Sequence, residues 1–441
     1  MARRWARRYD RAGGLELRGY VRGRSAVGRL RVVPENEIVT FGCRLNAFES
    51  EVIRQAANAA GLTDAVIINT CAVTAEAERQ AGQAIRRARR QHPAAKIIVT
   101  GCAAHLSPDR YTALPEVDLV LNNRAKLQSQ SYRSEQGSIA DPVQTPPHFA
   151  EGPAGRYRAF LEVQQGCDHR CTFCIIPYAR GASRSVPIGL IAARARGLVA
   201  AGYREIVLTG VDLTAYGADL PGKPNLGQMV RRLLAAVPEL RRLRISSLDP
   251  AEIDAELWRL VAGEERLMPH VHLSLQAGDD VILKRMKRRH SRRQAVAVAQ
   301  RARASRPDIA LGADLIAGFP TETEEMFRNS VGLIDECGLA FVHVFPYSAR
   351  PGTPASRMPQ LPNTVIKERA ARLRAAGAAA LAAELSNRIG SETDVLVERP
   401  GMGRAAFYAP MSFTGPDSPG SLRRMRVVGS NGAELMGVAV Q

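Results

Sequence analysis

The sequence lacks any run approaching the roughly 18 apolar residues of a membrane-spanning helix, and it has no signal-peptide core. Aromatic residues are few, at 5% of the chain with two tryptophans. Acidic residues are outnumbered, because 61 lysines and arginines face 43 aspartates and glutamates, which leaves a net charge of +18. We therefore expect a cytoplasmic protein without a membrane partner, and the basic excess favours a polyanion such as nucleic acid.

Cysteine is also scarce, with seven residues in 441, and the number is odd. In a long chain without a secretion signal, an odd number argues against a disulfide framework and for thiolate chemistry. The length itself suits two to four domains. Residues 1–36 hold ten arginines against three acidic residues and show no apolar periodicity. We expect this segment to be a basic, disordered extension or an over-long start of the chain.

Three short β-branched runs, each ending at a cysteine, alternate with helical patterns after this extension. The strand-like runs are 38–43, 65–71 and 96–102, and the helical patterns are 48–60 and 75–90. Right-handed crossovers would make the strands parallel, so residues 37–127 are predicted to form an open α/β sheet. Cys43, Cys71 and Cys102 would then leave the sheet at the same edge.

The remaining chain divides into a linker and two further units. Residues 128–156 are rich in Ser, Pro and Gly and are interpreted as the linker. Six strand-like runs alternate with helices through residues 157–388, at 158–164, 205–209, 243–247, 270–275, 309–316 and 341–345. They predict a partial barrel of about six parallel strands with its active site at the C-terminal strand ends. Four strand-like pieces in residues 389–441 predict a small antiparallel β-barrel, at 393–398, 405–413, 425–428 and 433–440.

The sharpest chemical feature is the spacing of Cys167, Cys171 and Cys174, a C-x3-C-x2-C run after the first barrel strand. Three thiolates on one loop can bind three irons of a 4Fe-4S cluster and leave the fourth iron open. A zinc site with His169 as fourth ligand is the alternative, for which the spacing is poor. The three cysteines of the N-terminal unit are a second candidate set. A single cysteine at a strand end is usually a small buried hydrophobic residue, but three that each follow a strand, at Cys43, Cys71 and Cys102, are harder to explain in this way.

Residues 166–181, with the sequence GCDHRCTFCIIPYARG, resemble the cluster loop of the radical S-adenosylmethionine methylthiotransferases. The resemblance extends from Glu37 to the end of the chain. It implies that Cys167, Cys171 and Cys174 hold the catalytic 4Fe-4S cluster, whose open iron binds S-adenosylmethionine and yields a 5′-deoxyadenosyl radical. It further implies an auxiliary 4Fe-4S cluster that supplies or carries sulfur, with its three ligands at Cys43, Cys71 and Cys102.

The resemblance also implies sites outside the cysteines. By analogy, four residues at predicted strand ends line the nucleoside pocket of S-adenosylmethionine, with barrel packing or turn chemistry as the competing explanation: Gly210, Ser247, Gln276 and Tyr347. The final unit resembles a TRAM-like RNA-binding barrel, where three arginines supply charge for phosphates but few aromatics can stack on bases: Arg423, Arg424 and Arg426. Cys337, His270, His272 and His290 match no ligand pattern and are expected in core or solvated positions.

Arg44-Leu45-Asn46, directly after Cys43, resembles the branch that acts on N6-threonylcarbamoyladenosine next to the anticodon. The resemblance thus implies a monomeric tRNA methylthiotransferase that modifies C2 of this base, with the anticodon stem-loop and an electron donor as partners. Isopentenyladenosine in tRNA and an aspartate of a ribosomal protein are the alternative substrates. A non-catalytic iron–sulfur RNA-binding protein is the alternative of another class.

Overall fold

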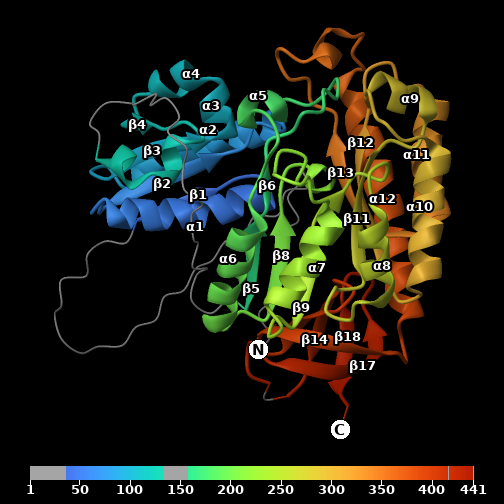
Figure 1. Ribbon diagram of the computed structural model, residues 1–441. Helices are drawn as coiled ribbons and strands as arrows, with labels where there is room; N and C mark the ends of the chain where they lie inside the picture. Colours follow the sequence, from blue (N-terminus) through green and yellow to red (C-terminus); the bar gives the residue numbers. More distant parts are fainter. Residues whose placement is uncertain (1–35, 134–156, 416, 441) are drawn as a thin grey trace, which may run out of the picture.

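Residues 36–133, 157–415 and 417–440 are described by a computed structural model, in which three units follow one another along the chain (Figure 1). The expected α/β fold class, with an open parallel sheet, a partial barrel and a small closed C-terminal barrel, is confirmed. The predicted basic extension, apart from Asn36, and residues 134–156 of the predicted linker lie outside the described residues. No helix in the described ranges is long and apolar enough to cross a membrane.

The N-terminal unit is a parallel sheet in the order β1-β2-β3-β4. Its strands are β1 Glu37–Thr40, β2 Ala65–Thr70, β3 Lys96–Gly101 and β4 Leu119–Val120. Its helices are α1 Arg44–Ala59, α2 Ala75–Gln91, α3 Cys102–Leu106, α4 Pro108–Thr112, η1 Ala125–Leu127 and η2 Ser129–Tyr132. Alternate residues of β2 and β3 enter two different core clusters, one on each face, which explains their continuous hydrophobic character.

The start of the predicted linker belongs to this unit. Tyr132 is buried, and its hydroxyl donates to the backbone oxygen of Lys126 over 2.5 Å. It joins the same core cluster as Ile53 and Ile67. Residues 128–133 are mostly polar, so their composition did not indicate that Tyr132 is buried in this core.

The central unit is a partial barrel of parallel strands built from two sheets. One sheet contains β5 Arg158–Glu162, β8 Glu205–Thr209 and β9 Arg242–Ile245, and the other contains β10 Ser247–Leu248, β11 His270–Gln276, β12 Ala310–Ala317 and β13 Leu339–Pro346. Ser246 interrupts the strand that joins the two sheets. No ladder between β5 and β13 closes the barrel within the described ranges.

Helices cover the outer face of these strands, and the largest core cluster lies between the two layers (Figure 1). The covering helices are α6 Ile188–Ala200, α7 Leu226–Ala236, α8 Ala255–Gly263, α10 Arg292–Ser305 and α11 Glu324–Cys337. The connections between strands and helices also contain α5 Ile176–Arg180, α9 Asp280–Arg285 and the short turns η3 Leu213–Ala215 and η4 Pro354–Arg357. A two-stranded ribbon, β6 Gln164–Gln165 and β7 Arg184–Ser185, lies beside the barrel. Cys337 is fully buried in this core, as expected.

The long helix α12, Asn363–Asn387, leads into the closed C-terminal barrel. Its strands run in the order β14-β15-β16-β18-β17: β14 Glu392–Arg399, β15 Met402–Ala405, β16 Pro410–Phe413, β17 Leu422–Ser430 and β18 Leu435–Ala439. The pairing is antiparallel except between β16 and β18. Residues 405–413, which were predicted as one strand, are divided by a turn in which Tyr408 adopts a positive φ of 86°.

The C-terminal barrel lies at the end of the central barrel where the parallel strands begin (Figure 1). The buried carboxylate of Glu205 anchors this contact, because it binds Arg242 at 3.0 Å and Arg244 at 3.1 Å. The same two arginines donate to the backbone oxygens of Ala405 and Ala406. Burial alone would raise the pKa of Glu205, but these arginines hold it well below its usual range.

Replacement of Glu205 by Ala is expected to lower the free energy of unfolding by about 3–5 kcal/mol, because two buried guanidinium groups lose their countercharge. Urea titration of both proteins measures the difference. Glu368→Ala, which removes an exposed carboxylate with one 3.5 Å ion pair, serves as control and should cost less than about 1 kcal/mol. Equal losses in the two variants would contradict the anchoring role of Glu205.

Candidate functional site

The loop that carries the C-x3-C-x2-C run connects β6 to α5 and is held at both ends by the backbone. Gly166 has a φ of +73°, and a Cβ at this position would lie 2.0 Å from the Ala182 oxygen, so only glycine fits. The Cys167 amide donates to Gly181 at 3.1 Å, and the Thr172 amide donates to Met286 at 3.1 Å. The three cysteines therefore lie on a short loop whose path is fixed by neighbours distant in sequence.

The thiols of this loop are close enough to oppose one another's ionisation. Burial raises the pKa of Cys167 to about 12, with further contributions from Asp212 and the other two thiols. Burial likewise raises the pKa of Cys174 to about 11. Bound cations relieve this repulsion between thiolates, and three soft thiolate donors suit an iron–sulfur cluster. The three side chains are partly accessible, so the donor set fits an iron–sulfur cluster open to a small ligand.

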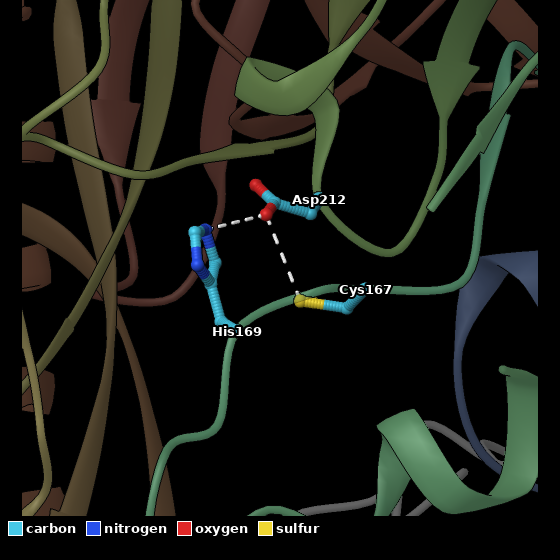
Figure 2. Close-up of side chains that lie close together, drawn as sticks. All are labelled: Cys167, His169 and Asp212. Carbon is cyan, nitrogen blue, oxygen red and sulfur yellow. Dashed lines mark hydrogen bonds and ion pairs between the residues drawn. The ribbon is translucent and has the colours of Figure 1, made fainter. Parts of the chain in front are cut away.

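Asp212 and His169 stand beside Cys167 (Figure 2). The Asp212 Oδ2 atom lies 3.6 Å from the Cys167 sulfur and 2.7 Å from His169 Nε2. Hydrogen bonds to Asp212 and Glu252 raise the pKa of His169 to about 10. His169 Nε2 is thus engaged by carboxylates, although Cys167, His169 and Asp212 also lie close enough together to hold one metal ion.

The second set of cysteines leaves the N-terminal sheet at one edge, as the strand pattern predicted. Thr40 pairs with Asn69, which pairs in turn with Thr100, so the following cysteines are carried out of neighbouring strands at the same level. Cys43 precedes α1 and is exposed, whereas Cys71 and Cys102 are buried.

These three thiols also interact. Burial raises the pKa of Cys71 to about 12, and Cys43 and Cys102 act in the same direction. Gly42, with a φ of +93°, leaves room for Cys71, because a Cβ there would lie 2.7 Å from its sulfur. The donor set fits a second iron–sulfur cluster by the same argument as the first.

Helix α5 connects the two cysteine sets. It follows Cys174 almost directly, and its Ala179 oxygen accepts from Asn123, whose amide nitrogen is also 3.8 Å from the Cys102 sulfur. At its end, Arg180 donates to Asn46 at 2.6 Å and to Glu49 at 2.9 Å.

Glu49 is the buried countercharge at this junction. Lys126 also binds it, at 2.7 Å, and neither side chain is exposed to solvent. Burial would raise the pKa of Glu49, yet Arg180 and Lys126 lower it to about 2.

The four residues expected in the nucleoside pocket lie at or beside strand ends of the central barrel. Gly210 is packed against Gln164, whose side-chain oxygen accepts from the amides of Val211 and Asp212. Gln276 ends β11 with a positive φ of 70°, and Ser247 is half-buried in β10. Tyr347 is buried edge-to-face against Phe319 at 5.6 Å.

The arginines expected to contact RNA are partly neutralised within the C-terminal barrel. Arg423 binds Asp417 at 2.7 Å, and Arg424 and Arg426 both bind Glu392, at 3.4 and 3.1 Å. All three side chains are more than half exposed.

His272 is buried, in agreement with the expected core position, but sequence reasoning missed the polar group that it forms inside the barrel. Asp314 Oδ1 lies 2.9 Å from His272 Nε2 and 3.2 Å from His343 Nδ1. These residues come from three neighbouring strands, so no local spacing could have indicated the group. Arg288 was missed for the same reason, although its guanidinium lies 3.7 Å from the Cys171 sulfur and 3.0 Å from Asp249.

Comparison with known proteins agrees with this geometry. Residues 161–334 match the radical SAM superfamily, and residues 36–122 match an uncharacterized protein family, UPF0004. The "threonylcarbamoyladenosine tRNA methylthiotransferase MtaB" of Rickettsia prowazekii is 50% identical over 398 residues, covering 89% of this chain and 94% of that protein. A "tRNA-2-methylthio-N(6)-dimethylallyladenosine synthase" of Cereibacter sphaeroides is 37% identical over 384 residues, covering 82% and 87%.

Among solved structures, the radical S-adenosylmethionine methyltransferase TsrM of Kitasatospora setae has a TM-score of 0.52 at 15% identity, covering 70% of this chain and 72% of that one. The fold and the cysteine loop thus define a radical S-adenosylmethionine enzyme, a class that uses a 4Fe-4S cluster and S-adenosylmethionine. More narrowly, the chain belongs to the radical S-adenosylmethionine methylthiotransferase family.

The junction around Glu49 generates a prediction for Glu162, which accepts from Gln165 at 3.1 Å. Burial, together with the charge of Glu49, raises the pKa of Glu162 from 4.5 to about 7, against the opposing charges of Arg180, Arg194 and Lys126. The native state then binds a proton that the unfolded chain releases, so stability falls as pH rises from about 4.5 through about 7.

Glu162→Gln removes this titration and is expected to raise the free energy of unfolding at pH 8 by roughly 1–3 kcal/mol, with little change at about pH 4.5. Denaturant titrations of wild type and variant at several pH values measure the difference in the free energy of unfolding. Exposed Glu239, changed to Gln, is the control. Parallel pH profiles for wild type and Glu162→Gln would contradict the prediction.

Proposed function

We propose that this protein attaches a methylthio group to C2 of N6-threonylcarbamoyladenosine in the anticodon stem-loop of tRNA. The observation that supports it best is the pair of cysteine sets on either side of α5, joined through Arg180 and Glu49. Methylthiolation of an unreactive ring carbon needs two functions, removal of hydrogen and delivery of sulfur, and a separate centre for each suits this arrangement. Relatives named as threonylcarbamoyladenosine tRNA methylthiotransferases support the choice of base.

In this proposal Cys167, Cys171 and Cys174 hold the 4Fe-4S cluster that binds S-adenosylmethionine. The second set, Cys43, Cys71 and Cys102, holds an auxiliary 4Fe-4S cluster. When bound, the first cluster and S-adenosylmethionine supply the radical chemistry, and the second supplies sulfur. An external electron donor is required.

The protein's own residues fix the two centres. Arg180 and Asn123 hold α5 against the auxiliary set, while Asp212 and Arg288 stand beside the sulfurs of Cys167 and Cys171. Gly210, Ser247, Gln276 and Tyr347 remain the proposed contacts of S-adenosylmethionine. The exposed arginines of the C-terminal barrel contribute contacts to tRNA phosphates.

Cysteine variants separate the two centres. Cys171→Ala is expected to abolish formation of 5′-deoxyadenosine from S-adenosylmethionine, whereas Cys71→Ala should retain it and lose only the methylthio product. Each variant should bind about four irons instead of about eight after anaerobic reconstitution. Cys337→Ala, which alters a buried thiol outside both sets, should keep the full iron content. An unchanged iron content in Cys71→Ala would exclude the auxiliary cluster.

Deletion of the gene provides the test of the substrate. Digested tRNA from the deletion strain should lose 2-methylthio-N6-threonylcarbamoyladenosine and accumulate the unmethylthiolated nucleoside, as measured by mass spectrometry. The wild-type gene should restore the product, and the Cys71→Ala gene should not. Loss of a dimethylallyl derivative, or a mass change on a ribosomal protein, would show that the substrate assignment is wrong.

A further inference from the structure

The lumen of the central barrel contains polar side chains that the two cysteine sets do not explain. On β11, Val271, Leu273 and Leu275 belong to the core beneath the helices, so His272 faces the lumen. Its side chain is 3% exposed and is held by Asp314. Gly312 makes room for it, because a Cβ there would lie 2.6 Å from His272 Nδ1.

His343 is the accessible member of this group. Its neighbours Val342 and Val344 pack toward the helices, so His343 points into the lumen from β13, the strand beside the open side of the barrel. Its side chain is 50% exposed, and its ring lies 4.7 Å from that of His272. Since Nδ1 contacts Asp314, the other ring nitrogen is left for a ligand.

Arg44 reaches the same region from the N-terminal unit. It is the residue after Cys43, and its guanidinium lies 3.4 Å from the Tyr408 hydroxyl and 5.8 Å from the ring centre. Tyr408 comes from the C-terminal barrel and stacks on His270 at 4.7 Å. All three units therefore contribute side chains to one end of the lumen.

The charge at this end is not balanced. Arg158 and Arg404 bind Glu398, and Arg244 binds Glu205, but Arg44 has no carboxylate within ion-pair distance in the described part of the chain. Burial would raise the pKa of Tyr408, yet Arg44 and these three arginines lower it to about 7. Arg44 and Tyr408 are half-buried, and an excess of positive charge at a partly desolvated position favours an anionic ligand.

We propose that Arg44 binds the carboxylate of the substrate's threonylcarbamoyl group, with the Tyr408 hydroxyl as a second donor to that carboxylate and the free ring nitrogen of His343 as an acceptor for the hydroxyl of the same substituent. The inference rests on the proposed function and adds to it the residue that selects the N6 substituent. A threonylcarbamoyl group ends in a carboxylate and carries a hydroxyl, whereas a dimethylallyl group has neither. The apolar substituent would leave Arg44 desolvated and unpaired, which excludes it.

The proposal also explains how the base would be oriented. Arg44 follows Cys43 directly in the chain, so its backbone is anchored next to the auxiliary cysteine set while its side chain extends to Tyr408. The rigid start of α1, fixed through Asn46 to the backbone of Phe41 and Thr70, limits how far Arg44 can move. Recognition of the carboxylate and placement of the base are thereby coupled.

The test compares two anticodon stem-loop RNAs, one with N6-threonylcarbamoyladenosine and one with the uncharged carboxamide in place of its carboxylate. The reconstituted wild-type enzyme should prefer the carboxylate roughly 10- to 100-fold in kcat/KM, as expected for a charged hydrogen bond. Arg44→Gln should lose this preference mainly through the carboxylate substrate, and Arg44→Lys should keep part of it. Binding of each RNA by fluorescence anisotropy gives a second readout.

Arg54→Gln is the matched control, because Arg54 lies on the same helix and its side chain is 39% exposed. It should keep the wild-type preference, and turnover of the carboxamide RNA by Arg44→Gln reports that this variant is folded. An unchanged preference in Arg44→Gln overturns the proposal while the proposed function stands. Wild-type enzyme that methylthiolates neither RNA refutes the proposed function and this proposal with it.

A metal ion is the competing occupant of the group formed by His272, Asp314 and His343. Elemental analysis of wild type and His343→Ala decides between the two. One equivalent of a metal other than iron, lost in His343→Ala, would overturn the assignment of this lumen to the substrate.

Discussion

The buried carboxylate of Glu49 is the interaction on which the relative placement of the two cysteine sets depends. It lies on α1, the helix that begins after Cys43, and it binds Arg180 of α5, the helix that follows Cys174. Lys126 completes the group. Desolvation offsets much of the attraction in such a buried network, so its net contribution to stability is modest. Separating the two units would deprive Arg180 of its carboxylate and leave Glu49 with Lys126 alone, so the pairing favours one relative placement of the units.

The side-chain amides of Asn46 and Asn123 fix how α5 is oriented relative to the cysteine sets. Asn46 donates to the backbone oxygens of Phe41 and Thr70 and accepts from Arg180, so the loops around Cys43 and Cys71 are tied to α5 through one side chain. Asn123 likewise ties the loop around Cys102 to α5, because its side-chain nitrogen lies beside the Cys102 sulfur and donates to the Ala179 backbone oxygen. Because α5 has only five residues, the distance between the sets is set by a short, rigid element and not by a flexible linker. Two centres that act on one base need such a fixed separation.

Features with a local signature were predicted from the sequence, and features formed by distant residues were not. Parallel strands that each end at a cysteine predicted the shared edge of Cys43, Cys71 and Cys102, because strand periodicity and crossover handedness are local rules. The pairing of Glu49 with Arg180 joins residues 131 positions apart, so no periodic pattern in the sequence indicates it. His272, Asp314 and His343 were missed for the same reason. The turn at Tyr408 was read as strand because no glycine marks its positive φ.

Tyr408 shows that the C-terminal barrel is part of the central unit's architecture. Glu205 holds Arg242 and Arg244 at the first residues of the barrel strands, and these arginines bind the carbonyls of the hairpin that carries Tyr408. The hairpin thereby closes one end of the lumen with an aromatic ring that stacks on His270. Arg44 meets this ring from the opposite unit. Since three units of the chain contribute side chains to this end of the lumen, its shape and charge depend on the contacts among all three, and so does the proposed selection of the substrate.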